Sequence, residues 1–226
     1  MSSEFVSIRD AVSNFAKSLE NGSKIVDLGC GLQPYRSFFS KAQYIGLDVE
    51  ASGRKASDKS ADIYFNGIII PLESASVDAI LCTEVLEHAI EPEELVKEMF
   101  RILRPGGRLC VTVPFIWGLH ELPYDFRRFT SIGLANLFTG HGFVIDYQEN
   151  LTTGARAIRM LIDSEVNNYL VNVLPKRSIS PAALRWLRLK IIIHERILRV
   201  LDRLWRTTFC FERVYIDNLL LAHKPL

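Results

Sequence analysis

The chain has 226 residues, 48% of them hydrophobic and 23% charged, which is an ordinary globular composition and excludes a disordered protein. Its 27 basic and 26 acidic residues leave a formal charge of +1, so no overall positive charge favours nucleic acid. No segment approaches the ~18 consecutive apolar residues of a membrane span, and the N-terminus lacks a basic-then-apolar signal pattern. These features predict a cytoplasmic protein.

The cysteines argue against disulfides and against a metal site. Cys30, Cys82, Cys110 and Cys210 lie far apart, without a CxxC pair or a nearby histidine at ligand spacing. We therefore expect a reducing compartment and no bound metal.

Apolar runs alternate with helical patterns along the chain. Apolar residues at gaps of three and four predict a helix over 4–20. Further helices are predicted over 34–41 and 92–103, and one begins at Thr130 and ends at Gly140 or Gly142. Short apolar runs predict strands at 24–28, 44–47, 63–65, 77–82, 108–113, 143–148 and 213–222.

This alternation predicts an α/β fold of the Rossmann-like kind. Seven mostly parallel strands would form one sheet with helices on both faces. Between the sixth and seventh strands, helical periodicity covers 154–172 and 181–208. The predicted organisation is a single domain over 1–226, with a helical insertion over 154–209.

The second helix of the insertion, 181–208, is amphipathic and basic. Residues 176–208 contain nine basic and two acidic residues. Two apolar seams run along this helix, the first through Trp186, Leu189, Ile193, Ile197, Val200 and Leu204. Three interpretations remain open: packing within the protein, a homodimer interface, or a peripheral contact with an anionic membrane surface.

The first strand ends in a glycine-rich turn, and an acidic residue ends the second. Gly29 and Gly31 let the backbone approach a ligand closely, because neither carries a Cβ. Asp48 follows Gly29 by 19 residues, the spacing at which a carboxylate accepts from ribose hydroxyls. Pro34 stands where a dinucleotide fingerprint needs its third glycine, so the pattern favours a nucleoside without a pyrophosphate.

At this point the chain resembles a known family. Its motifs, in order, are Asp27–Gly31 (DLGCG), Asp48, Ser76–Ile80 (SVDAI), Glu84–His88 (EVLEH) and Leu103–Gly107 (LRPGG). They are similar to the successive motifs of class I S-adenosylmethionine-dependent methyltransferases, specifically the type 11 family. The resemblance covers about 22–150 and the final strand, and it implies S-adenosylmethionine as cofactor, with S-adenosylhomocysteine as product.

The resemblance also implies roles for individual residues. Asp27, Gly29 and Gly31 would surround the methionine end of the cofactor. Asp48 would hold the ribose and Asn66 the adenine amino group. The expected cofactor-binding set is completed by Thr83 and Glu84, near the sulfonium, and by Cys30, Val49 and Gly67.

The segment 114–130 follows the fifth strand and mixes aromatic with ionisable residues, as functional loops at this edge of a sheet do. It resembles type 11 enzymes encoded among bacterial surface-polysaccharide and natural-product genes.

A hydroxyl acceptor needs a general base, and His120 is the first candidate, with Glu121 or Asp125 as its orienting partner or as the base. Asp125 could instead form a structural ion pair with an arginine, and His88 could be a packing histidine or a further catalyst.

The sequence therefore predicts a methyltransferase that acts on a small molecule. The expected acceptor is a hydroxyl or amine of a sugar, glycan or natural-product intermediate, and carboxyl methylation stays open. A catalytically silent or non-methylating S-adenosylmethionine-binding protein that serves a partner is the alternative. Nucleic acid is not expected, because Cys82–Val85 stands where nucleic-acid enzymes have an Asn/Asp-Pro-Pro-Tyr/Phe tetrapeptide.

Overall fold

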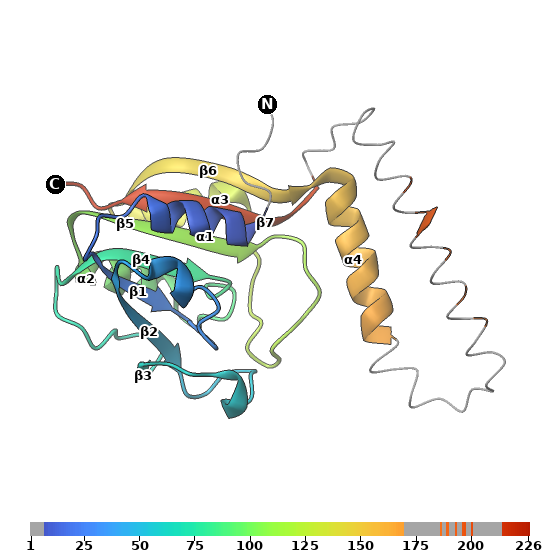
Figure 1. The fold of residues 1–226 in the computed structure, drawn as a ribbon, viewed down its shortest axis with the longest axis horizontal. Helices are drawn as coiled ribbons and strands as arrows, with labels where there is room; N and C mark the ends of the chain where they lie inside the picture. The colour runs from blue at the N-terminus through green and yellow to red at the C-terminus, as the bar shows by residue number, and fades with distance from the viewer. Residues whose placement is uncertain are drawn as a thin grey trace. The chain divides into compact units, whose positions relative to one another are not determined.

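The computed structural model (Figure 1) describes residues 7–169 and 214–226, together with positions 186, 189, 193, 196, 197 and 200. The chain divides into two compact units. The first comprises residues 1–151 and 217–226, and the second comprises residues 152–216.

One seven-stranded sheet organises the first unit, in the order β3-β2-β1-β4-β5-β7-β6. Its strands are β1 Lys24–Leu28, β2 Gln43–Val49, β3 Ile63–Phe65, β4 Val77–Thr83, β5 Leu103–Pro114, β6 Val144–Thr153 and β7 Tyr215–His223. β1, β2, β3, β4 and β5 pair in parallel, whereas β7 pairs with β5 in the antiparallel sense. The predicted fold class is confirmed.

Helices cover both faces of the sheet (Figure 1). Successive residues of β4 show why: Ile80 and Cys82 belong to one core cluster, whereas Ala79 and Leu81 belong to the other. The first cluster takes buried residues from α2 Pro92–Ile102 and α3 Ser131–Gly140, and the second takes them from α1 Ile8–Lys17. Strands that are buried on both faces form nearly continuous apolar runs, as the sequence showed.

Two helix starts follow from capping side chains. Ser7 Oγ accepts from the Asp10 amide at the start of α1, and Thr130 Oγ1 accepts from the Gly133 amide at the start of α3, 3.0 Å away. The predicted Thr130 cap is thus confirmed. The predicted start of α1 at residue 4 lies outside the described residues.

Several boundaries differ from the sequence-based expectation; β6, for example, ends at Thr153 rather than at residue 148. The helix predicted over 34–41 is only the 3₁₀ turn η1 Arg36–Phe39, because Gln33 adopts a left-handed φ of 56° and β2 begins soon afterwards, at Gln43. β5 begins directly at the end of α2 rather than at residue 108. Val77 pairs with Leu103 and Ala79 with Arg108, so the Pro-Gly-Gly segment lies within the strand as an irregularity of register.

In the second unit, α4 spans Gly154–Asn168, against a prediction of 154–172. Most of the predicted helix 181–208 lies outside the described residues. Its described apolar positions Trp186, Leu189, Ile193, Ile197 and Val200 are exposed. Over the parts of the chain that the structure describes, no helix has the length and apolarity needed to cross a bilayer. The dimer and membrane-surface interpretations stay predictions.

Phe138 tests the core between α3 and the sheet. It is fully buried and packs edge-on against Phe143, with ring centroids 5.4 Å apart. Phe138→Ala should lower the free energy of unfolding by about 3–5 kcal/mol, because it removes buried apolar surface and leaves a cavity. Ile132, 72% exposed on the same helix, is the control. Urea unfolding should show Ile132→Ala within ~0.5 kcal/mol of wild type, and equal effects of the two substitutions would refute this packing.

Candidate active site

A cavity of about 550 Å³ lies at the carboxyl ends of the strands, within the ~300–1,000 Å³ typical of small-molecule sites. The strand order reverses between β1 and β4, and ligands of open α/β sheets bind at such a point. The cavity is lined from the ends of β1, β2, β3 and β4, and from the two segments 84–90 and 121–124. Of the expected cofactor residues, the lining includes Gly29, Asp48, Val49, Asn66, Gly67 and Glu84.

The glycine turn after β1 is tied to the end of β2. Gly29 and Gly31 have φ values of +74° and +53°, which favour glycine. The Gly29 amide donates to the Leu47 carbonyl at 2.7 Å. A Cβ on Gly29 would stand 2.3 Å from Val85 Cγ2, so a side chain there would displace the wall formed by the segment after β4. The turn can therefore remain close to a ligand only as glycine.

Asp48 is held as a fixed carboxylate at the cavity wall. Its Oδ2 accepts from the Gly31 amide at 2.9 Å, and its Oδ1 accepts from the Val49 amide at 2.7 Å. Lys59 Nζ lies 4.0 Å from Oδ1 and donates to the Glu50 carbonyl. Each carboxylate oxygen keeps a lone pair for a further donor such as a ribose hydroxyl. Lys59 is not among the residues expected from the sequence, because the polar stretch around it gives no sign that it is buried.

Asp27 is buried beneath the turn rather than on the cavity wall. Tyr44 donates a hydrogen bond to its Oδ2, while Oδ1 has no hydrogen-bond partner within the described segments. Burial raises the pKa of Asp27 to about 7. A buried carboxyl with an unused oxygen fits the ammonium group that the family resemblance assigns to this position.

Asn66 and Gly67 line the far end of the cavity after β3. Asn66 Oδ1 accepts from the amides of Ile68 and Ile69, at 3.0 and 2.8 Å. Both lone pairs of this oxygen are therefore used by the turn itself, so the structure does not support the expected hydrogen bond from the adenine amino group to Oδ1. Three expected cofactor residues, Cys30, Gly31 and Thr83, do not line the cavity but are close in sequence to residues that do.

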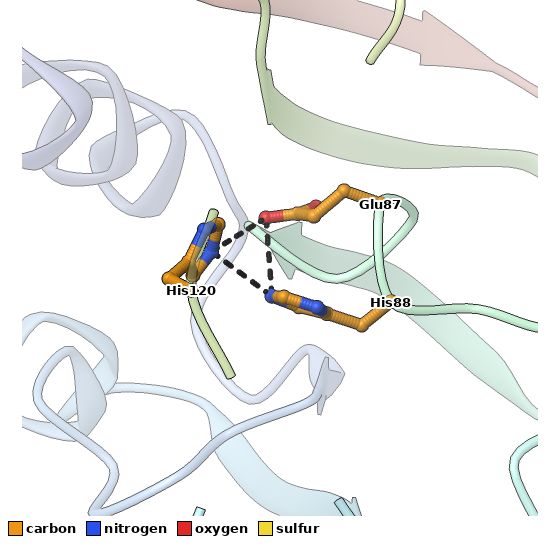
Figure 2. Close-up of side chains that lie close together, drawn as sticks. All are labelled: Glu87, His88 and His120. Atoms are coloured by element: carbon orange, nitrogen blue, oxygen red, sulfur yellow. Dashed lines mark hydrogen bonds and ion pairs between the residues drawn. The ribbon is translucent and has the colours of Figure 1, made fainter. Parts of the chain in front are cut away.

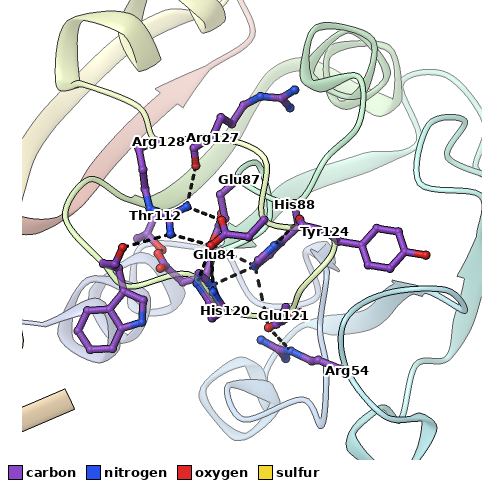
Figure 3. A network of polar contacts seen from close by, with 12 residues as sticks. Arg54, Glu84, Glu87, His88, Thr112, His120, Glu121, Tyr124, Arg127 and Arg128 are labelled. Atoms are coloured by element: carbon purple, nitrogen blue, oxygen red, sulfur yellow. Dashed lines mark hydrogen bonds and ion pairs between the residues drawn. The ribbon is translucent and has the colours of Figure 1, made fainter. Parts of the chain in front are cut away.

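The segment 114–130 is docked on the EVLEH segment by backbone and side-chain contacts (Figure 3). The Phe126 amide donates to the Glu87 carbonyl at 3.0 Å, and His88 Nδ1 lies 2.8 Å from the Tyr124 carbonyl. Arg127 donates to the Ala89 carbonyl. Two segments singled out separately in the sequence therefore form one wall of the site.

A buried ion pair fixes the shape of the docked segment. The fully buried Asp125 carboxylate accepts from both terminal nitrogens of Arg128, and its Oδ2 accepts from the His120 amide at 3.0 Å. The arginine holds the pKa of Asp125 down, at about 2. Asp125 thus forms a structural ion pair with Arg128, which was one of the roles expected for it. Because its carboxylate is buried and stays ionised, it is unsuited to act as a general base. Its Oδ2 also lies 3.3 Å from His120 Nδ1, which makes it the orienting partner of that histidine.

His88, His120 and Glu87 converge beside the cavity (Figure 2). The two Nε2 atoms are 3.1 Å apart, and Glu87 Oε1 lies 3.6 Å from that of His88 and 3.8 Å from that of His120. His88 lines the cavity. Glu87 was not among the site residues expected from the sequence, although the EVLEH motif that contains it was recognised.

Glu121 connects the docked segment to the loop after β2. Arg54 Nε donates to Glu121 Oε1 at 2.5 Å, and both residues line the cavity. The backbones also meet closely, since a Cβ on Gly53 would stand 1.8 Å from the Glu121 carbonyl oxygen. Glu121 is thus paired at the cavity wall and is not in contact with His120 Nδ1, which faces Asp125.

Buried carboxyl groups gather near this end of the cavity, and one of them, Glu84, lines it. Glu84 Oε1 accepts from Thr112 Oγ1 at 2.8 Å, and burial raises the pKa of Glu84 to about 7. Burial and the neighbouring Glu84 also raise the pKa of Glu87, to about 9, and that of Asp217, to about 8. A group of buried acids with strongly raised pKa values is typical of functional sites.

Comparison with protein families identifies the class of this domain. Residues 26–111 match the model of a methyltransferase domain. They include the glycine turn, Asp48, the EVLEH segment and the strand that leads to the docked segment. Residues 26–111 thus match a methyltransferase domain, and the resemblance noted in the sequence is confirmed over this part of the chain.

The matches to curated relatives cover only part of each protein. An uncharacterized methyltransferase-like protein of Schizosaccharomyces pombe is 37% identical over 89 residues, covering 34% of each chain. The tRNA (carboxymethyluridine(34)-5-O)-methyltransferase of Mus musculus is 27% identical over 118 residues, covering 49% of this chain and 17% of the relative. The chain thus spans 34% of the length of the first of these relatives and 17% of the length of the second.

The solved structure of the [4+2]-cyclase SpnF has the same fold. It superposes with a TM-score of 0.62 at 17% identity, covering 99% of this chain and 85% of SpnF. At this identity the likeness shows the fold and not the reaction.

Replacing Asp48 should weaken cofactor binding. Asp48→Ala removes the acceptor for the ribose hydroxyls, and each buried polar group left unpaired costs about 1–3 kcal/mol. The dissociation constant of S-adenosylmethionine should therefore rise at least ~10-fold in calorimetry. Asp58→Ala, an exposed carboxylate nearby in sequence, should leave it unchanged. An unchanged affinity in Asp48→Ala would contradict the placement of the ribose.

The raised pKa of Asp27 predicts a pH-dependent stability. Since its pKa rises from 3.8 to about 7 on folding, the folded state binds the proton more tightly, and stability falls as pH rises between about 4 and about 7. Asp27→Asn abolishes this loss, so its advantage over wild type should grow through that window and level off above it, reaching at most ~4 kcal/mol. Urea unfolding across this range measures it; a difference independent of pH would contradict the assignment.

Proposed function

We propose that this protein transfers a methyl group from S-adenosylmethionine to a hydroxyl of a small molecule, such as a sugar, glycan or natural-product intermediate. The observation that carries the proposal is one cavity that joins the glycine turn and Asp48 at one side to the His88 segment at the other. A nucleoside site and a cluster of proton-accepting side chains thus share a wall.

The residues of the chain fit the cofactor. The glycine turn leaves backbone room, the Asp48 carboxylate has free lone pairs, and Asp27 offers an unused buried oxygen. When bound, S-adenosylmethionine supplies a methyl group on a sulfonium sulfur. The buried acids Glu84, Glu87 and Asp217 lie near that end of the cavity, and a positive charge there would favour their ionised forms.

The docked segment supplies what a hydroxyl acceptor needs. Asp125 accepts from the backbone of His120 and faces its Nδ1, so the Nε2 lone pair points toward His88 and Glu87. This cluster can take up or offset the proton that the acceptor loses, whereas positioning in the cavity aligns the acceptor for transfer. An amine acceptor would need only its neutral form, so the cluster favours the hydroxyl.

A second candidate acceptor is RNA. The mouse relative is named for methylation of a carboxymethyluridine in tRNA, so the small charge of the chain does not justify the expectation that nucleic acid is excluded. The other alternative is a protein that binds S-adenosylmethionine without transferring its methyl group. The likeness of the fold to that of a cyclase supports this alternative.

Transfer of a labelled methyl group tests the proposal. The protein would be incubated with radiolabelled S-adenosylmethionine and with nucleotide sugars, glycans and unmodified or carboxymethylated tRNA, and Asp48→Ala would serve as the cofactor control. Label in the sugar or glycan fraction supports the proposal, and label in tRNA replaces it with the second candidate. Binding of the cofactor without transfer to any fraction would favour the non-methylating alternative.

His120 separates chemistry from binding. With an acceptor identified, His120→Ala should lower kcat about 10²–10⁴-fold, because it removes one member of the proton-accepting cluster. The affinity for S-adenosylmethionine should stay within a few-fold of wild type. Leu119→Ala, at the exposed neighbouring position, is the matched control. A kcat within a few-fold of wild type in His120→Ala would exclude His120 from the chemistry.

A further inference from the structure

The contacts of His88 fix which of its nitrogens carries a proton. His88 Nδ1 lies 2.8 Å from the Tyr124 carbonyl oxygen, which can only accept. Nδ1 must therefore donate, and in the neutral ring Nε2 is left with a bare lone pair. That lone pair is directed at His120 and Glu87 (Figure 2).

His120 is constrained in the same way. Its Nδ1 lies 3.3 Å from Asp125 Oδ2 and 3.2 Å from the Gly118 carbonyl oxygen, and both of these are acceptors. Its Nε2 is therefore also a lone pair in the neutral ring. Two lone pairs 3.1 Å apart repel each other unless a positive centre lies between them.

Glu87 adds a third electron-pair donor to the same point when its carboxyl group is deprotonated. Its side chain has no exposed surface, and neither carboxylate oxygen has a hydrogen-bond partner within the described residues. A buried carboxylate normally has such partners, because leaving it without them is costly. Glu87 Oε1 instead faces the two imidazole nitrogens (Figure 2).

We propose that Glu87, His88 and His120 bind a divalent transition-metal ion. Their three ligand atoms form a triangle with sides of 3.1, 3.6 and 3.8 Å, whose circumscribed circle has a radius of about 2.0 Å. Zinc bonds to imidazole nitrogen and carboxylate oxygen are ~2.0–2.2 Å long. One ion thus reaches all three atoms with almost no movement of the side chains.

The chemistry of the ligands selects the kind of ion. Two imidazoles and one carboxylate suit Zn²⁺ and its neighbours Fe²⁺, Co²⁺ and Ni²⁺, whereas Mg²⁺ and Ca²⁺ prefer oxygen alone. The Tyr124 carbonyl and the Asp125 carboxylate behind the imidazoles are the outer partners that metal-binding histidines characteristically have. Three protein ligands leave a position open for an oxygen of the substrate.

This inference rests on the proposed function for its role in catalysis. His88 lines the cavity, so the ion would lie beside the acceptor, bind its hydroxyl and lower the pKa of that hydroxyl, and the proton would pass to solvent water. The acceptor oxygen would then form a bond to the methyl carbon as the carbon–sulfur bond of the sulfonium breaks, which leaves S-adenosylhomocysteine. The acceptors best suited are hydroxyl compounds with an oxygen that can coordinate the metal. The sequence-based expectation of no metal followed from ligand spacing along the chain, which does not reveal the contact between residues 87–88 and 120.

Direct metal binding tests the site independently of methyl transfer. The full, tag-free chain, freed of metal by chelator and dialysis, would be titrated with Zn²⁺ in a calorimeter and with Co²⁺ in a visible spectrophotometer. We expect one equivalent to bind, with Co²⁺ giving the ligand-field absorption of a site with nitrogen ligands. Glu87→Gln, His88→Ala and His120→Ala should each weaken binding by more than the ~10–100-fold that loss of an outer partner costs.

His141→Ala provides the matched control, because His141 contacts the Leu137 carbonyl at the end of α3, outside the site. Its metal affinity should equal that of wild type. Glu87→Gln keeps the shape of the side chain, and circular dichroism of the metal-free variants shows whether they fold.

Three outcomes would overturn the proposal: no stoichiometric binding of either ion, equal binding in folded ligand variants, or loss of binding in His141→Ala alone. In the first case a proton shared between the two imidazoles would balance the cluster. Methyl transfer that fails while the metal still binds would instead refute the proposed function and leave the metal site standing. Transfer that proceeds undiminished in metal-free protein would refute the catalytic role of the ion.

Discussion

The contact on which the site depends is the buried pair between Asp125 and Arg128. It closes the docked segment on itself within four residues, and the same carboxylate accepts from the backbone of His120 and faces its ring. A buried carboxylate separated from its guanidinium would be strongly unfavourable, so the segment has little freedom to rearrange. This places His120 against His88, although the two residues lie 32 positions apart in the sequence.

The sheet supplies the second half of the site. Parallel pairing of β1, β2 and β4 gathers their carboxyl ends at one edge, which brings the glycine turn, Asp48 and the EVLEH segment together. The close approach of Gly53 to Glu121 and the pair between Arg54 and Glu121 then join the loop after β2 to the docked segment. The cavity is therefore enclosed by segments that are each fixed by specific contacts.

The sequence was sufficient for the fold and for much of the cofactor side. Strand periodicity and the spacing from Gly29 to Asp48 are local signals, and the structure places both residues at the cavity. It was insufficient for the cluster. Glu87 is one of several acidic residues in and after the EVLEH segment, and the sequence does not distinguish it from the others. Its burial without a hydrogen-bond partner among the described residues depends on the tertiary contact with residues 114–130. The turn in which the Asn66 oxygen accepts from two amides also has no distinctive pattern in the sequence, and the expected contact of this oxygen with adenine stays a prediction.

A crystal structure with bound S-adenosylhomocysteine is the most direct measurement of the central claim, which is that one cavity joins a nucleoside site to the Glu87–His88–His120 cluster. The account predicts ribose hydroxyls within hydrogen-bond distance of Asp48, the homocysteine end beside the glycine turn, and the sulfur directed toward the cluster. A nucleoside bound away from Asp48, or a sulfur separated from the cluster by the docked segment, would contradict it.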